Sequence, residues 1–97
     1  MIDEIAERIR TIGGTAVHSI GDVARNQRLK DHDANDCSAT DMLRELLADN
    51  RQLTTFLRHA HEACDHHRDV ATASLIENWI DESEKRVWFL NETTRDR

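Results

Sequence analysis

The hexapeptide Cys64-Asp65-His66-His67-Arg68-Asp69 (CDHHRD, residues 64–69) separates the two longest helical patterns in this chain. Apolar residues recur at helical spacing from about residue 41 up to this connection, and again after it to about residue 91. Two long antiparallel helices joined by a tight polar turn form half of a helix bundle. We therefore expect an all-α fold that is built on this helical pair.

Both helices carry recognisable signals at their beginning and along one face. Ser38-Ala39-Thr40-Asp41 resembles a capping box in which Asp41 replaces the usual Glu, so a long helix should follow it. The second helix has a three-four alternation that is flanked by aromatic residues, which we expect to be core or interface residues. The expected apolar positions are Met42, Leu43, Leu46, Leu47, Leu53, Phe56, Leu57, Ala60 and Cys64 in the first helix, and Ala73, Ile76, Ile80, Ser83, Val87 and Leu90 in the second.

Composition supports a helical chain with an incomplete core. The 97 residues include no proline and only three glycines, so helix breakers are confined to a short region. Hydrophobic residues make up 38 % of the chain, which is below the usual share for a self-contained domain. A domain of this length is already short of buried surface. We expect partner chains or a missing segment to complete the core.

The charge balance and the cysteines restrict the class of protein. Lys and Arg number 13 against 19 Asp and Glu, and this net charge of −6 argues against a sequence-independent grip on nucleic acid. No apolar stretch is long enough for a membrane span, and no signal peptide is visible. Cys37 and Cys64 lack C-x-x-C spacing, so we expect reduced thiols and a cytoplasmic location.

The amino-terminal part begins as though in the middle of a helix. Ile2, Ile5, Ile9 and Ile12 fall on one face, and Gly13-Gly14 should end this helix. The chain supplies no residue before Met1 to cap it, which suggests a truncated or cropped protein. After the glycines we expect a mixed connection, with a short helical turn around Ile20, Val23 and Ala24 and a turn-forming segment from Asp31 to Asp36.

Three stretches together resemble the Dps family of miniferritins, which belongs to the ferritin superfamily. Residues 3–8, Asp-Glu-Ile-Ala-Glu-Arg, with Ile12-Gly13-Gly14 after them are similar to the family's D-x-x-A-E-R pattern and its Gly-Gly break. The short helix and acidic loop before residue 38 are typical of these proteins. Residues 69–73 and the sequence from Glu84-Lys85 to Leu90 resemble the family's final helix, with its T-A-x-x-L opening and (D/E)-K-x-x-W-(F/M)-L ending.

The resemblance covers essentially the whole chain and implies an incomplete ferritin-like four-helix bundle. Residues 1–13 correspond to the end of the family's second helix, 14–37 to the connection with its short helix, 38–66 to the third helix and 69–92 to the fourth. The family's first helix is missing, and with it two iron-binding histidines and a lysine-rich tail. No histidine of this chain matches those positions.

Asp3 and Glu7 are the candidate metal ligands. Their spacing of four residues puts both carboxylates on one helix face, and oxygen ligands suit a hard cation such as iron. The resemblance implies that they are the carboxylate half of a ferroxidase centre, with the histidines donated by a neighbouring subunit. It further implies oxidation of Fe²⁺, preferably by peroxide, storage of the ferric product and assembly of the complete chain as a dodecamer. The alternative is an acidic first turn that complements the helix dipole.

Acidic residues of the last helix are candidates for an iron-entry pore, because the family's final helix contributes carboxylates to a three-fold channel. The usual acidic position of the family aligns with Ser74 here, so Glu77 or Asp81, further along the helix, would have to substitute. The alternative is a solvated helix face.

Several further assignments stay open. His61 and Cys64, inside the cluster from His59 to His67, have a spacing that suits zinc, although histidines at a helix end often only contact exposed carbonyls. The segment from Arg25 to Lys30 is a candidate for DNA phosphates, but acidic residues follow it. Family members usually bind DNA through the tail that is absent here, and protection by removal of Fe²⁺ and peroxide needs no contact. Nucleoid association is therefore open. The competing function is an inactive helical remnant that only associates with other subunits.

Overall fold

The computed structural model describes residues 1–31 and 38–95, and the regular structure in these ranges is entirely helical. The expected all-α class is therefore confirmed. Most of the turn expected at residues 31–36, and Cys37, lie outside the described residues. The helices are α1 (Ile2–Thr11), α2 (Ile20–Asn26), α3 (Ala39–His66) and α4 (Val70–Thr94).

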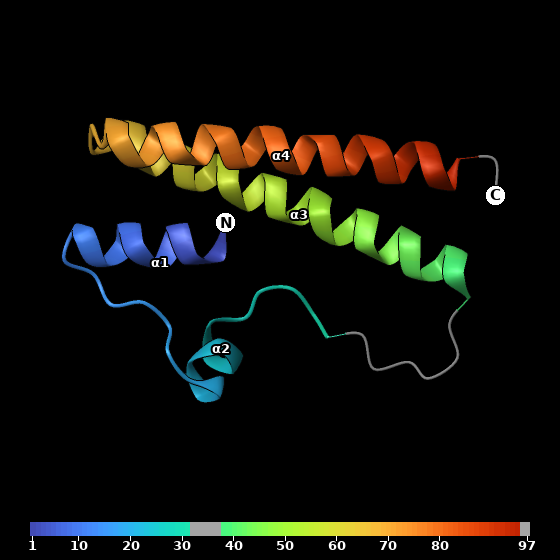
Figure 1. Ribbon diagram of the computed structural model, residues 1–97, viewed down its shortest axis with the longest axis horizontal. Coiled ribbons are helices and arrows are strands. Elements are labelled where there is room, and N and C mark those ends of the chain that lie inside the picture. Colours follow the sequence, from blue (N-terminus) through green and yellow to red (C-terminus); the bar gives the residue numbers. More distant parts are fainter. Residues whose placement is uncertain (32–37, 96–97) are drawn as a thin grey trace. The chain divides into compact units, whose positions relative to one another are not determined.

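The chain divides into two units, Met1–Asp31 with α1 and α2, and His32–Arg97 with α3 and α4 (Figure 1). In the first unit, α1 ends as its glycines predict. Gly13 adopts a φ of 92°, and the Gly14 amide donates to the Ile9 carbonyl over 2.8 Å. A Cβ atom on Gly14 would lie 2.8 Å from the Ile9 side chain, so this turn requires glycine at both positions.

The short helix α2 is held by one aspartate. The Ser19 hydroxyl caps the helix by accepting from the Asp22 amide over 3.0 Å. The Asp22 carboxylate in turn accepts from the His18 amide at 3.3 Å and pairs with Arg25. These local bonds explain how a helix of 7 residues without a buried residue keeps its form.

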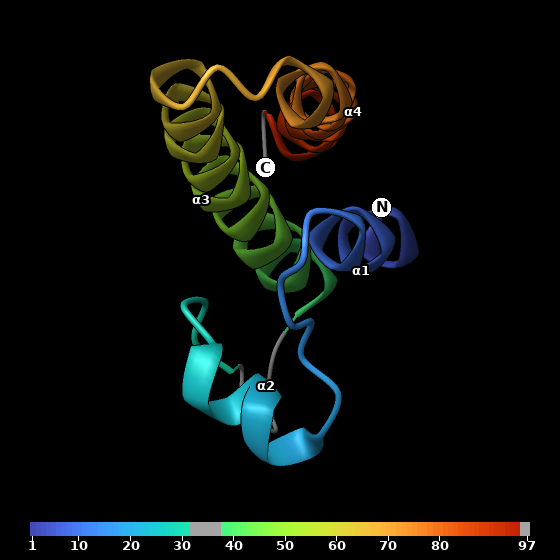
Figure 2. The same cartoon turned by 90° about the vertical axis from the view of Figure 1, so that its left-hand side faces the viewer.

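In the second unit, α3 and α4 lie side by side and antiparallel (Figures 1 and 2). Two polar cross-links fix their register. Thr54 and Ser83 share a hydrogen bond of 2.8 Å, and Arg86 Nε donates to Asn50 Oδ1 over 2.9 Å. Asn50 precedes Thr54 on α3, whereas its partner Arg86 follows Ser83 on α4. This opposite order is what an antiparallel hairpin requires.

The core between these helices is a narrow stripe. Only Leu47 and Leu57 of α3 are buried, whereas Met42 and Leu46 remain more than half exposed. Two helices alone cover little more than the facing seam, so an apolar stripe as wide as the one predicted stays partly uncovered. The buried residues of α4 are Ala73, Ile76, Trp79, Ser83, Leu90 and Thr94.

The connection between the helices is as tight as its sequence suggests. The Asp69 amide donates to the Cys64 carbonyl over 2.8 Å, and Arg68 adopts a φ of 56° in the left-handed region. The Asp69 side chain then caps α4 by accepting from the Thr72 amide over 3.1 Å. The reversal therefore depends on a position that usually favours glycine but carries arginine here.

The last helix extends past its expected end near Asn91 and reaches Thr94. Thr94 is only 8 % exposed, and its hydroxyl donates to the Leu90 carbonyl over 2.8 Å. This bond and the burial of the side chain keep the last turn helical.

Candidate functional site

The candidate iron ligands Asp3 and Glu7 lie within α1, one turn apart, and both are exposed. Their carboxylates therefore project from the same helix face into solvent. Of the isoleucine face that the sequence predicted, Ile5 and Ile9 are half-buried, whereas Ile2 and Ile12 are exposed. Two free carboxylates at this spacing supply oxygen ligands for a hard cation and leave the remaining ligand positions to other groups.

The candidate pore residues Glu77 and Asp81 are both exposed on α4, but each has a cationic or imidazole partner. Asp81 pairs with Lys85, one turn further along the same helix, at 3.1 Å. Glu77 instead contacts α3, where its Oε2 lies 2.8 Å from Nε2 of His61. The two carboxylates therefore have different surroundings, and only Glu77 connects the two helices.

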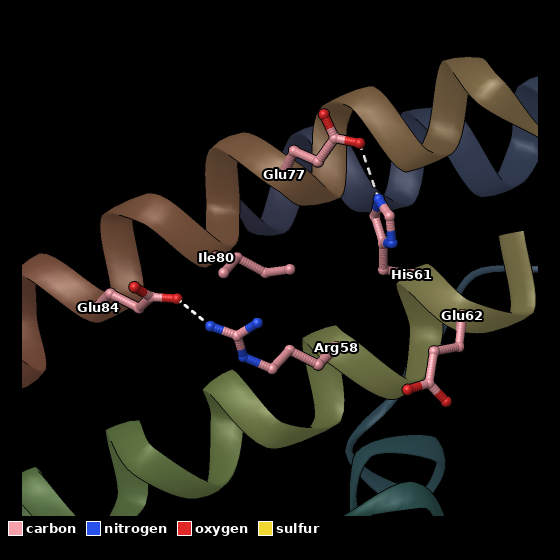
Figure 3. A pocket seen from close by; sticks show the side chains of 6 residues that line it. All are labelled: Arg58, His61, Glu62, Glu77, Ile80 and Glu84. Atoms are coloured by element: carbon pink, nitrogen blue, oxygen red, sulfur yellow. Dashed lines mark hydrogen bonds and ion pairs between the residues drawn. The ribbon is translucent and has the colours of Figure 1, made fainter. Parts of the chain in front are cut away.

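A solvent-open pocket of about 410 Å³ lies between α3 and α4 around this contact. Two ion pairs cross it, His61 with Glu77 and Arg58 with Glu84, and Ile80 lies between them (Figure 3). Glu62 also lines the pocket, but its side chain extends away from the His61–Glu77 contact (Figure 3). The pocket thus combines imidazole, guanidinium and carboxylate groups from two helices that pack against each other.

The environment of His61 favours its protonated form. The hydrogen bond with Glu77 raises the pKa of His61 above its ordinary value, partial burial opposes this change, and the negative charge of Asp65 adds to the increase. The Asp65 carboxylate lies 3.6 Å from Nδ1, on the other side of the ring. The imidazole therefore stands between two carboxylates.

The structure does not gather the histidine cluster into one metal site. The His66 and His67 rings meet edge to face, with centroids 5.1 Å apart, and Cys64 is a reduced thiol that has an interaction partner of its own. In residues 1–31 and 38–95, no three His, Cys, Asp or Glu side chains are placed to enclose a metal ion. The shorter of the two carboxylate contacts of His61 is with Glu77, which sequence spacing alone did not reveal.

The basic segment before the acidic loop offers few unpaired charges. Arg25 is engaged by Asp22, and Arg28 also has an interaction partner. Lys30 is exposed. Across the described part of the chain, no helix combines the length and apolar character needed to cross a membrane.

The cross-links between α3 and α4 are what the sequence analysis missed. His61 and Glu77 are 16 residues apart, and Arg58 and Glu84 are 26 apart, so no local periodicity relates them. The tight turn at residues 64–69 was the available signal, because an antiparallel pair folded about it brings residues at similar distances from the turn together. The exact register still depends on how the side chains pack.

Comparison with known proteins supplies a family for this fold. The family model for the ferritin-like domain matches residues 1–96 of this chain. A low temperature-induced protein of Nostoc sp. is 37 % identical over 90 residues, which are 92 % of this chain and 50 % of that protein. A DNA protection during starvation protein of Agrobacterium fabrum is 27 % identical over 98 % of this chain and 59 % of its own length.

A solved structure has the same fold. The crystal structure of Helicobacter cinaedi CAIP superposes with a TM-score of 0.87 at 18 % identity, covering 95 % of this chain and 64 % of that one. The chain spans between one half and three fifths of the length of the curated relatives that it matches.

Proposed function

Since this chain belongs to the ferritin-like family and has Dps proteins among its relatives, we propose that the complete protein is a Dps-type ferroxidase and iron store. In this proposal it binds Fe²⁺, oxidises it with peroxide and retains the ferric product. It would thereby protect DNA from the radicals that free Fe²⁺ and peroxide generate.

The observation that carries the proposal is the pair Asp3 and Glu7. Both carboxylates are exposed on one face of α1, and this helix lies inside the region that matches the ferritin-like domain. Carboxylate oxygens bind hard cations, and an exposed pair remains accessible to groups of a second chain. The sequence resemblance adds that such a second chain would contribute histidines.

The chemistry assigned to this chain is binding and orientation. Asp3 and Glu7 would hold ferrous substrate ions by their charged oxygens and favour the more highly charged ferric product electrostatically. Each peroxide accepts one electron from each of two ferrous ions, so retention of two ions near one another would match the stoichiometry. Iron is the substrate and the stored cargo in this scheme.

Glu77 and Asp81 would act on the entry path rather than in oxidation. Both carboxylates are exposed, so they would attract Fe²⁺ in competition with their partners His61 and Lys85. The family resemblance motivates this role, which requires several copies of α4 around one channel. A dodecamer with a cytoplasmic location is part of the same proposal, and direct DNA contact is not needed for protection.

The test uses the complete protein supplied with Fe²⁺ and peroxide. A double variant, Asp3→Ala with Glu7→Ala, should oxidise Fe²⁺ at least about 10–100-fold more slowly than the parent. A loss of this size follows when a group that only supports the metal ligands is removed, and direct ligands should matter at least as much. The absorbance of the ferric product measures the rate, and iron per particle measures storage. Glu4→Ala is the matched control, since Glu4 lies in the same first turn but at a different angle around α1. Equal oxidation and loading in the double variant and the parent would refute the site.

A second candidate function is subunit association without oxidation. The specific observation is exposed aromatic surface on α4, where Trp88 is 66 % and Phe89 is 62 % exposed. Large apolar side chains at such exposure are typical of interaction surfaces. Light scattering together with the oxidation assay separates the two functions: assembly with no oxidation above background would favour this one.

A further inference from the structure

One face of the α3–α4 hairpin, here called the Trp88 face, joins two neighbouring pockets that both include Glu84 in their lining. Its principal side chains are Arg51, Thr55, Arg58 and Glu62 of α3, and Glu84 and Trp88 of α4. We propose that a second copy of this chain docks on the Trp88 face across a two-fold axis, with Arg51 of each copy paired with Glu62 of the partner subunit. The inference goes beyond the ferroxidase proposal. It rests on the association candidate, for which it names the partner and the surface.

The α3 side of the Trp88 face is a single exposed stripe. Arg51, Thr55, Arg58 and Glu62 follow one another at steps of four, three and four residues, and all four are exposed. This spacing keeps side chains on one side of an α-helix, and it is the repeat by which helices pair in coiled coils. The stripe therefore presents a continuous surface to another helix.

The two ends of the stripe carry opposite charges that form no ion pair within residues 1–31 and 38–95. Arg51 makes a long hydrogen bond of 3.5 Å to the side-chain oxygen of Asn91 and meets no carboxylate there. Glu62 lines its pocket without a cationic partner in contact. Arg58, between them, is already engaged by Glu84 (Figure 3). The stripe thus has a surplus positive charge at one end and a surplus negative charge at the other.

A two-fold axis satisfies both surplus charges at once. Arg51 and Glu62 lie about 16 Å apart along α3, at 1.5 Å per residue. In a symmetric contact of two copies, residue i meets residue j and residue j meets residue i. Two α3 helices that pack antiparallel about the midpoint of the stripe therefore bring each arginine to the glutamate of the other copy. Parallel packing would instead place like charges together, so the charges select both the partner and its direction.

Trp88 supplies an apolar anchor beside this charge pair. It is 66 % exposed and lines the same pocket as Arg51. Tryptophan and arginine are enriched at protein interfaces, and the residues that contribute most to binding are often of these two types. Burial of the Trp88 ring against a second copy would therefore stabilise the contact in which Arg51 takes part.

The hairpin is also large enough for a stable dimer contact. The helices α3 and α4 have 28 and 25 residues. With a rise of 1.5 Å per residue and a diameter of about 10 Å, two such helices present a face of roughly 40 by 20 Å, or roughly 800 Å². Each partner of a typical specific interface buries about this area.

A second groove between α3 and α4 is a poorer place for the second copy. Its apolar side chains are Leu46, Phe89 and Leu90, and its charged lining residues, Lys85 and Arg86, are both positive. Two copies that met there would bring like charges together, which disfavours association. The self-complementary charges lie on the Trp88 face.

Charge reversal tests the pairing, with sedimentation equilibrium of this chain as the measurement. Arg51→Glu and Glu62→Arg each place like charges together at both ends of the contact, so each should raise the dimer Kd at least about tenfold. The double variant restores opposite charges and should associate as the parent does. A mixture of the two single variants should form a heterodimer, although each one alone associates weakly.

Matched substitutions in the second groove serve as controls. Lys85→Glu makes the same change of charge as Arg51→Glu and should keep the Kd of the parent. Trp88→Ser should raise the Kd at least about tenfold, whereas Phe89→Ser removes the neighbouring aromatic ring and should leave it unchanged. Circular dichroism checks that every variant keeps its helices.

The inference is overturned if the mixed single variants fail to associate, or if Lys85→Glu loses as much affinity as Arg51→Glu. Association that persists unchanged in both single variants overturns the Trp88 face alone and leaves the association candidate standing. A parent chain that stays monomeric at every concentration overturns both. The oxidation assay decides the ferroxidase proposal separately, because Asp3 and Glu7 are untouched in all of these variants.

Discussion

Ser83, which is completely buried on α4, shares a hydrogen bond of 2.8 Å with Thr54 on α3. The Ser83 hydroxyl also lies 2.9 Å from the Ile80 carbonyl, and the Thr54 hydroxyl lies 2.9 Å from the Asn50 carbonyl. The two hydroxyl protons can fill only two of these three contacts at any one time. Because every oxygen of this group has a partner, a polar pair is tolerated at the centre of the seam and fixes the register of the two helices.

The Ser83 position should reject a large side chain. Ser83→Leu adds apolar volume where no space is free, and we expect it to lower the free energy of unfolding by about 1–3 kcal/mol. Ser83→Ala should cost only about 1 kcal/mol, because Thr54 keeps its bond to the Asn50 carbonyl. Urea unfolding followed by circular dichroism measures both. A leucine variant as stable as the alanine variant would show that the seam is looser than described.

The left-handed residue of the connection should be improved by glycine. Arg68 has a φ of 56°, a region that disfavours a side chain, so Arg68→Gly should raise the free energy of unfolding by about 0.5–1 kcal/mol. His67→Gly is the matched control, because His67 has a φ of −95° and gains nothing from glycine. In thermal unfolding, the midpoint of Arg68→Gly should lie above that of the parent, and the midpoint of His67→Gly should lie below it. An unchanged midpoint in Arg68→Gly would contradict the assigned turn.

The cap of α4 should depend on the Asp69 side chain. Asp69→Ala removes the acceptor of the Thr72 amide and should cost about 1 kcal/mol, whereas Asp69→Asn should retain most of the stability because asparagine also caps helices. Chemical denaturation gives the values. Equal losses in the two variants would indicate that charge, rather than the capping bond, is what matters.

The His61–Glu77 contact should make stability depend on pH. The pKa of His61 is raised in the folded chain, mainly by the Glu77 hydrogen bond, above its unfolded value of about 6.5. Its contribution is therefore fully present below the unfolded pKa and is lost as the pH rises through the folded pKa. In metal-free buffer, the parent should lose stability between about pH 6.5 and the folded pKa.

Two variants isolate this effect. Glu77→Gln should flatten the decline in stability across that window, because the group that chiefly raises the His61 pKa is removed. Asp81→Asn should keep the decline, since Asp81 pairs with Lys85 and not with His61. Thermal midpoints measured across the pH range provide the comparison. A parallel decline in the parent and Glu77→Gln would contradict the pairing.

Much of the fold was accessible from the sequence because it rests on local signals. The lack of proline, the Ser38 cap and the Gly13-Gly14 break predicted helices, and the structure has α1, α3 and a left-handed glycine where those signals lie. The resemblance to the Dps family predicted a ferritin-like bundle, which the matched domain and the superposed structure support. The extension of α4 to Thr94 was not predicted, because neither the hydrogen bond of the Thr94 hydroxyl nor its burial follows from a periodic pattern in the sequence.

The sequence by itself determined the helices, their polar turn and the shared face of Asp3 and Glu7, since neighbours within one or two turns set all of these. Only the tertiary structure decided that His61 meets Glu77 rather than Cys64, that Thr54 meets Ser83, and that Leu47 is buried while Leu46 is exposed. The reason is physical. These relations join residues on different helices, and their register follows from side-chain packing across the seam, which no spacing along one helix encodes.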